Sequence, residues 1–347
     1  MHDKYYTYSG LLHVHSNYSD GTRTIPEIAA IANELDVDFM LMSDHNTLQP
    51  KLDGLEGWYG HVLVGIGSEL NDAQDRNHYL AFNINSEIER NIPAEEYVCR
   101  VKEQGGFGII AHPDENRAHL AEYPPYPWTL WDSDCYDGME IWNQMSEWME
   151  GLTAKNKYIR ALHPRRSIVA PKAETLARWD ALNRKRSVVG VGGVDAHGYI
   201  YKLWGFIPKR IFRYKISFRT IRTYVILKEP LSHTDAAKDL QRIYSALRSA
   251  SCFVAHRYFG DASGFRFFAQ NKTGQITMGE QIPYTKNTKL RICCPKQARI
   301  KLIADGKLSE EREALETSFE IDGPGLYRVE IWYKERLWIL SNHMRVI

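Results

Sequence analysis

The segment Leu11–Thr22, LLHVHSNYSDGT, places two histidines one residue apart at the end of an apolar run. In a β-strand the side chains at positions i and i+2 point to the same face, so His13 and His15 are expected to project together. Asp20 follows on the next loop, where Gly21 permits a turn. Imidazole and carboxylate groups are ligands of borderline divalent cations. The segment therefore predicts one part of a metal site.

Further histidines and carboxylates begin or end other apolar runs along the chain. They are His45, Glu69, His78, His112, Asp195 and His197. Asp195 and His197 repeat the spacing of the first two histidines. In parallel α/β folds the loops after the carboxyl ends of the strands gather at one mouth, so most of these side chains should converge.

Nine such ligands are too many for one tetrahedral ion. Three ions that share a carboxylate would use them all, and Glu69 suits the bridging position because its two oxygens can bind two metals. A single histidine on a strand is usually a packed, hydrogen-bonded residue. The combination of all these segments at successive strand ends is what indicates a multinuclear metal site.

The elements that would position these residues alternate between strands and helices. Strands are predicted over residues 11–15, 37–45, 61–70, 78–84, 107–113, 138–143 and 187–197. Helices are predicted over residues 24–35, 94–104, 145–162, 174–184 and 234–250, the first with a capping box of Thr24 and Glu27. The nearly continuous apolar strands are typical of a parallel sheet buried on both faces, and the alternation predicts an α/β fold.

From about Asp261 the pattern changes to short alternating strands such as Leu326–Tyr333, LYRVEIWY. Helical signals are sparse there, which predicts a small antiparallel β domain of sandwich type. We therefore expect two domains: residues 1–259, an α/β metal-dependent hydrolase, and residues 260–347, a β-sandwich.

Composition limits the partners and the compartment. The 347-residue chain has a formal net charge of +1, which favours neither nucleic acid nor acidic partners. Its five cysteines show no C-x-x-C spacing, which favours a reducing compartment. The first residues contain no apolar signal region, and no apolar run approaches the ~20 residues that span a membrane. We expect a cytoplasmic protein without a membrane partner.

These motifs resemble those of the PHP (polymerase and histidinol phosphatase) superfamily of metal-dependent phosphoesterases, over roughly residues 8–255. The motifs are His13-Val14-His15, Ser19-Asp20-Gly21, Asp44-His45-Asn46, Glu69, His78, Ala111-His112-Pro113 and Asp195-Ala196-His197. The resemblance implies a distorted (β/α)7 barrel, TIM-like, with metals at its carboxyl-terminal mouth. The C-terminal segment resembles, more weakly, the tails of stand-alone bacterial members.

The resemblance also implies a distribution of the ligands over three ions. The first ion would be held by His13, His15, Glu69 and Asp195, the second by Glu69, His78 and His112, and the third by Asp20, His45 and His197. The cofactors would be two to three divalent ions of manganese, iron or zinc. A hydroxide bridging two ions would attack phosphorus while the third neutralises phosphate oxygens.

The predicted activity is that of a phosphatase or phosphodiesterase acting on a small phosphorylated metabolite or nucleotide. Asp195, His197 and Glu69 are the candidate catalytic residues. Asn46, Asn143 and Arg222 are the candidate substrate-binding residues. An alternative is ester or carbamate hydrolysis at the same site, as in relatives similar to carbaryl hydrolase. A third reading, a non-catalytic binding module, fits poorly with a complete ligand set.

Two segments have open alternatives. Residues 121–138, rich in proline and aromatic residues, would form either a lid over the site or a rigid packed loop. Residues 202–222 contain seven basic and no acidic residues, and would form either a phosphate- or nucleic-acid-binding face or a solvated basic surface.

Overall fold

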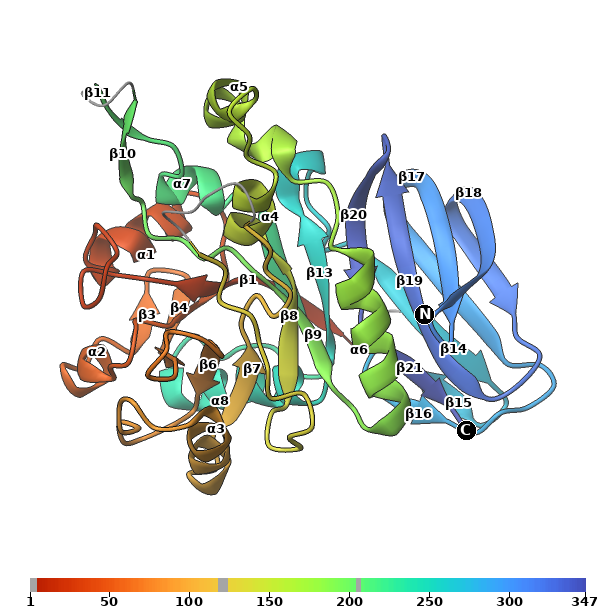
Figure 1. The fold of residues 1–347 in the computed structure, drawn as a ribbon. Coiled ribbons are helices and arrows are strands. Elements are labelled where there is room, and N and C mark those ends of the chain that lie inside the picture. Colours follow the sequence, from red (N-terminus) through yellow and green to blue (C-terminus); the bar gives the residue numbers. More distant parts are fainter. Residues whose placement is uncertain (1–4, 118–123, 204–206) are drawn as a thin grey trace.

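The computed structural model describes residues 5–117, 124–203 and 207–347. Residues 121–123 of the predicted lid and residues 204–206 of the basic segment lie outside this range. The chain folds as a mixed α/β protein (Figure 1). The strands that follow residue 260 gather on one side of the molecule, and most of the helices lie on the other.

One sheet begins in the N-terminal half of the chain. Its parallel strands are β1 (Tyr6–Val14), β2 (Phe39–Met42) and β4 (Val62–Ile66), with the short β3 (Gly57–Tyr59) antiparallel at the edge. On the other side of β1 follow two antiparallel strands, β12 (Ile221–Leu227) and β13 (Cys252–His256). Leu12, Leu41 and Val64 are fully buried, as expected for strands covered on both faces.

A second sheet of five strands contains β5 (Ser68–Leu70), β6 (Tyr79–Phe82), β7 (Phe107–Ile110), β8 (Gly138–Asn143) and β9 (Val189–Gly193), in that order. The last three strands are parallel, but β5, β6 and β7 pair antiparallel. The prediction of a wholly parallel sheet was therefore wrong here. The segment between Leu70 and Tyr79 is too short for a parallel crossover, which needs about a dozen residues or more.

The chain passes between the two sheets at Gly67, which divides the predicted strand 61–70 into β4 and β5. A side chain at Gly67 would place its Cβ 2.3 Å from the carbonyl oxygen of Ala81. Two isolated bridges also connect the sheets beyond their strand ends, Val14 with Ala196 and His45 with Glu69. Within the described residues the ladders do not run continuously round a barrel, so the (β/α)7 barrel stays a prediction.

The helices cover the sheets. The longer ones are α1 (Ile25–Asn33), α3 (Ala94–Glu103), α6 (Ala173–Lys185) and α8 (Ala236–Arg248). The shorter ones are α2 (Gln49–Leu52), α4 (Gln144–Glu150), α5 (Lys157–Leu162) and α7 (Tyr214–Ser217). The capping box of Thr24 and Glu27 at the start of α1 is confirmed.

The predicted helix 145–162 is two helices, α4 and α5. The guanidinium of Arg160, on α5, donates hydrogen bonds of 3.1 and 2.8 Å to the carbonyl oxygens of Glu147 and Trp148. These carbonyls belong to the last turn of α4, which has no further helical donors. Arg160 therefore caps α4 from the following helix, and a continuous helix would have no place for this contact.

The C-terminal strands are β14 (Arg266–Asn271), β15 (Gly274–Ile276), β16 (Gln281–Ile282), β17 (Lys289–Ala304), β18 (Lys307–Glu320), β19 (Gly325–Tyr333), β20 (Arg336–Ser341) and β21 (Met344–Val346). The alternating segment Leu326–Tyr333 lies in β19. β20 pairs with β13, so these strands continue the first sheet into a sheet of 14 strands. The domain boundary at residues 259 and 260 stays a prediction.

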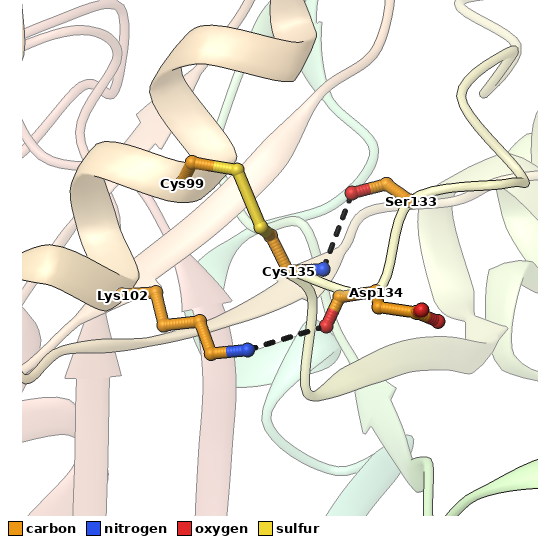
Figure 2. The surroundings of a disulfide bond; sticks show 5 residues. All are labelled: Cys99, Lys102, Ser133, Asp134 and Cys135. Atoms are coloured by element: carbon orange, nitrogen blue, oxygen red, sulfur yellow. Dashed lines mark hydrogen bonds between the residues drawn. A yellow bond between two sulfur atoms is a disulfide. The ribbon is translucent and has the colours of Figure 1, made fainter.

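A disulfide joins Cys99 on α3 to Cys135 in the segment before β8 (Figure 2). This bond was not predicted, because 36 residues separate the two cysteines and no sequence motif connects them. Cys252 and Cys294 are buried and lie outside this bond. None of the helices in the described ranges is both long and apolar enough to cross a membrane.

Candidate metal centre

Glu69, at the centre of β5, is buried and surrounded by imidazoles. Its Oε2 lies 3.0 Å from His13 Nε2, 3.2 Å from His15 Nε2 and 3.4 Å from His45 Nδ1. Its Oε1 lies 2.7 Å from His78 Nδ1 and 3.3 Å from His112 Nε2. One carboxylate thus contacts five histidines from four segments of the chain.

Two further carboxylates complete the cluster. Asp195 Oδ1 lies 3.6 and 3.7 Å from the Nε2 atoms of His13 and His15. Asp20 Oδ1 lies 3.3 Å from His197 Nε2 and 3.8 Å from His45 Nε2. The side chain of Asp20 is 42% exposed, whereas that of Asp195 is 9% exposed, so the cluster opens to solvent on the side of Asp20.

All nine predicted ligands fall into four overlapping groups whose donor atoms lie within 4.8 Å of one another. The groups are His13, His15 and Asp195; His13, Glu69 and His112; His45, Glu69 and His78; and His15, Asp20, His45 and His197. Because the groups share members, the distribution over three ions that the resemblance implied stays a prediction. The convergence itself is a property of the fold.

The backbone at several of these residues is unusual. His13, His112 and Asp195 have φ angles of 64°, 29° and 51°, in the left-handed region that residues other than glycine seldom adopt. The register of β1 against β2 also shifts between Leu12 and Val14. His13 therefore lies in a bulge, so simple strand alternation was the wrong reason to expect its side chain beside that of His15.

The two H-x-H-like segments are held side by side by backbone pairing. His15 N donates to Ala196 O at 3.0 Å, and Ala196 N donates to His13 O at 3.2 Å. Tyr214, on α7, donates its hydroxyl hydrogen bond to carbonyl oxygens of both His15 and His197, each at 2.8 Å. The first loop of the chain and the loop after β9 are thus fixed to each other.

Two buried carboxylates outside the predicted ligand set support the ligands. Asp44 accepts hydrogen bonds from Ser16 N, Ser16 Oγ and Ser19 Oγ at 2.8, 2.7 and 2.6 Å, which ties the loop after β1 to that after β2. Glu140, on β8, lies 2.9 Å from His13 Nδ1. Asp44 was part of the predicted motif Asp44-His45-Asn46, whereas the only sequence signal for Glu140 was a carboxylate within an apolar strand.

The electrostatics of the cluster keep His15 and the carboxylate of Glu69 deprotonated, the state that metals need, but they favour the protonated form of His78. Burial lowers the pKa of His15 to about 3, helped by nearby His197, so this imidazole is neutral. Burial alone would raise the pKa of Glu69, but the surrounding histidines, His13 and His45 foremost, bring it well below its usual range. Burial opposes the charged form of His78 too, yet Glu69 and Asp75 raise its pKa to about 10.

The donor set fits several transition-metal ions. His15 is fully buried, and neither of its ring nitrogens has a hydrogen-bond partner among the described residues. Buried polar atoms are nearly always satisfied, so two such nitrogens facing carboxylates point to a cation. Imidazole nitrogens mixed with carboxylate oxygens suit manganese, iron or zinc.

The predicted substrate-binding residues lie in different places. Asn46 is partly exposed beside the cluster, and its Nδ2 donates to Asn71 Oδ1. Asn143 caps α4 by accepting from Ser146 N at 3.0 Å, and it donates to Glu140 Oε2 at 2.9 Å. Asn143 therefore has both polar groups occupied within the protein.

The structure does not bring Arg222 to the cluster. Its guanidinium is buried and donates to Ser9 Oγ and to the carbonyl oxygens of Leu35, Asp36 and Phe218. Each of these partners lies outside the four ligand groups. The side chain holds the turn after α1, and we do not retain it as a substrate contact.

The described part of the predicted lid contacts the cluster through Tyr126. The ring of Tyr126 stacks on that of His78 with centroids 4.7 Å apart, while Trp128 is buried in the core beneath. A pocket of about 50 Å³ has His112, Glu140 and Lys172 in its lining. The loop thus has one aromatic side chain at the site and another packed below it.

No protein-family model matches the sequence. The chain is 28% identical over 171 residues to an uncharacterized protein of Methanocaldococcus jannaschii. The matched region covers 44% of this chain and 91% of that protein.

The fold is similar to that of a two-domain protein from Bacteroides vulgatus containing a predicted PHP-like metal-dependent phosphoesterase. The similarity covers 98% of this chain and 96% of the other, with 14% identity and a TM-score of 0.46. PsfC from Pseudomonas syringae is similar over 70% of this chain and 89% of its own, with 14% identity and a TM-score of 0.43.

Proposed function

We propose that this chain is a metal-dependent phosphoesterase that hydrolyses a small phosphorylated metabolite or nucleotide. The observation that carries the proposal is the buried Glu69 carboxylate, with five imidazoles within 3.4 Å of its two oxygens. A carboxylate whose two oxygens both face imidazoles can be shared by more than one ion. The motif resemblance to the PHP superfamily supports the same reaction class.

Two or three divalent ions bound here would supply an activated water at neutral pH and would neutralise the charge that develops on phosphate oxygens. The residues that would hold them are His13, His15, Asp20, His45, Glu69, His78, His112, Asp195 and His197. The burial of most of these side chains excludes bulk water from their donor atoms, which strengthens each electrostatic interaction with a substrate.

Other residues of the chain would orient the substrate. His197 Nε2 faces the exposed side of the cluster through Asp20, so it is our candidate for moving a proton to or from the substrate. Asn46 lies at the same rim, and its amide is our candidate hydrogen-bond donor. Tyr126, stacked on His78, offers a ring face to a base or aromatic leaving group.

The proposal is tested by metal analysis and a substrate survey of the purified protein. We expect more than one equivalent of transition metal, and turnover of phosphate esters after reconstitution with Mn²⁺, Fe²⁺ or Zn²⁺. Phosphomonoesters, phosphodiesters, aryl esters and carbamates should be compared at equal metal loading. Turnover confined to neutral esters would replace the phosphoesterase proposal with the ester or carbamate alternative. Protein that holds only alkali metals after reconstitution would refute both.

Glu69→Gln is the sharpest variant for this site. The amide keeps the shape of the side chain but removes the negative charge shared by the histidines, so we expect metal content to fall and hydrolysis to drop by orders of magnitude. Glu147→Gln is the matched control, since Glu147 is a buried glutamate whose contacts lie outside the ligand groups. Equal metal content in wild-type and Glu69→Gln protein would contradict a bridging role.

A further inference from the structure

Glu140 lies in the middle of β8 and is 1% exposed, yet it belongs to none of the four groups of candidate ligands. Its Oε1 is 2.9 Å from Nδ1 of His13. Its Oε2 accepts hydrogen bonds from the backbone N of His112 and from Nδ2 of Asn143, both at 2.9 Å. One buried carboxylate thus contacts two candidate ligands from behind, through a side chain and through a backbone amide.

The neighbouring strand leaves space for this contact. A Cβ placed on Gly193, in β9, would lie 1.7 Å from Glu140 Oε1 and 3.1 Å from the Cβ of His13. The φ angle of Gly193 is outside the left-handed region, so the backbone conformation does not require glycine. Glycine is required because a side chain would collide with Glu140. Glycine at this position allows the carboxylate to reach the imidazole.

From this geometry we propose that Glu140 is a positioning residue that selects the tautomer of His13. A carboxylate only accepts hydrogen bonds, so His13 must carry its proton on Nδ1. Nε2 is then the nitrogen that can release its proton to bind a metal ion, and it faces Glu69 Oε2 at 3.0 Å and Asp195 Oδ1 at 3.6 Å. The inference rests on the proposed function, because the lone pair of Nε2 is the one a metal ion would use.

The second carboxylate oxygen of Glu140, Oε2, is held in place by two donors. A neutral glutamine therefore cannot replace the carboxylate without changing the contact with His13. Because two donors, His112 N and Asn143 Nδ2, already point at Oε2, an amide at this position must turn its oxygen towards them. Its NH2 group would then face His13 Nδ1 and donate to it, which selects the opposite tautomer with Nε2 protonated. Protonated Nε2 has no lone pair for a metal.

The test is a Zn²⁺ titration of the full-length protein against a chromophoric chelator. We expect Glu140→Gln to weaken binding of at least one Zn²⁺ by about 10- to 100-fold, the effect typical of losing a carboxylate partner behind a ligating histidine. Glu147→Gln, in a buried glutamate on the following helix, should bind Zn²⁺ as the wild type does. Gly193→Ala should reproduce the loss, since it displaces the carboxylate without removing a polar group.

A second measurement needs no variant of Glu140. In Zn²⁺-loaded, ¹⁵N-histidine-labelled wild-type protein, His13 should give a slowly exchanging Nδ1–H signal paired with an unprotonated Nε2, assigned by its loss in His13→Gln. Absence of such a signal in wild-type protein overturns the inference even if Glu140→Gln fails to fold.

The outcomes separate this inference from the proposed function. Wild-type protein that binds no transition metal overturns the proposed function and this inference with it. Wild-type protein that binds Zn²⁺ while Glu140→Gln binds it equally well overturns only the role of Glu140. Equal losses in Glu140→Gln and Glu147→Gln indicate general destabilisation and also overturn it.

Discussion

Arg222 shows that the same residue type can serve chemistry or architecture, depending on what surrounds it. It lies on β12, fully inside the protein, and burial lowers the pKa of its guanidinium to about 10. Its hydrogen bonds reach the carbonyl oxygens of Leu35 and Asp36 at 2.7 and 3.0 Å. A charged side chain that satisfies buried carbonyl groups stabilises the fold, and no substrate is needed to explain it.

We therefore expect Arg222→Ala to lower the free energy of unfolding by about 2–4 kcal/mol, because several buried acceptors lose a charged donor. Urea unfolding of wild-type and variant protein measures this. Activity of the folded variant should change equally for phosphate esters and neutral esters. A loss confined to phosphate esters would restore a substrate-binding role.

Glu147 is a buried carboxyl group whose titration should be visible in stability. Burial raises its pKa to about 7, although Trp142 Nε1 and the backbone N of Val169 donate to it. The folded protein thus holds this proton more tightly than the unfolded chain, whose glutamates titrate near pH 4.3. This group makes the protein less stable as pH rises from the unfolded pKa to about 7.

Glu147→Gln should remove that dependence. Between pH 4.5 and 7 we expect the wild type to lose about 3 kcal/mol more stability than the variant. Denaturant unfolding of both proteins across this range gives the comparison, and groups common to both cancel in the difference. Parallel stability curves would show that Glu147 does not titrate in this window.

At the scale of elements, the predicted ligands lie at strand ends, and irregular backbone segments set the direction of their side chains. The register shift in β1 and the left-handed φ of His13 turn that imidazole into the cluster. The segment after β5 similarly returns as a short antiparallel connection to His78 and β6. Strained backbone concentrates at functional sites because the surrounding structure determines it, and this cluster follows that rule.

The disulfide between Cys99 and Cys135 joins α3 to the segment before β8. Closing a loop of 36 residues should stabilise the folded chain by about 3–4 kcal/mol by restricting the unfolded state. We expect thiol titration under denaturing conditions to find two more thiols after reduction than in oxidised protein.

Reduction should lower the urea midpoint, and Cys99→Ser should lower it equally in oxidising buffer. The predicted cytoplasmic location would keep these thiols reduced, so their redox state in cells also tests that location. Five free thiols in protein kept under oxidising conditions would contradict the bond.

At the scale of the whole molecule, the C-terminal strands are joined to the rest by buried charges as well as by the β13–β20 pairing. Arg328 on β19 makes two hydrogen bonds to Asp180 on α6, at 2.8 and 2.9 Å, and His343 Nε2 lies 2.8 Å from the same carboxylate. Burial opposes ionisation of Asp180, but these partners lower its pKa to about 2. Figure 1 shows α6 lying against the C-terminal strands.

Arg328→Ala should therefore destabilise the protein by about 3–5 kcal/mol at pH 7, since it leaves a buried carboxylate without its main partner. Asp180 contributes stability above its unfolded pKa, and that contribution is lost as pH falls through about 2. The difference between wild type and variant should shrink in acid. A pH-independent difference would assign the effect to packing of the arginine stem.

The amino-acid sequence by itself determined which residues gather at the candidate site. Ligand-type side chains at successive strand ends must meet in an α/β fold, so all nine could be named from their types and positions. The capping box of Thr24 and Glu27 could also be predicted from the sequence, because the two residues are only three positions apart. The α/β character followed from the alternation of apolar runs and amphipathic segments.

Only the tertiary structure decided how these residues are aimed and supported. The bulge at His13, the antiparallel β5–β7 order, and the contact of Glu140 with His13 across the space left by Gly193 join residues far apart in sequence. Arg222 likewise found its partners on the turn after α1. Local patterns report periodicity and propensity, but a hydrogen bond between distant strands depends on register and packing, which no short segment encodes.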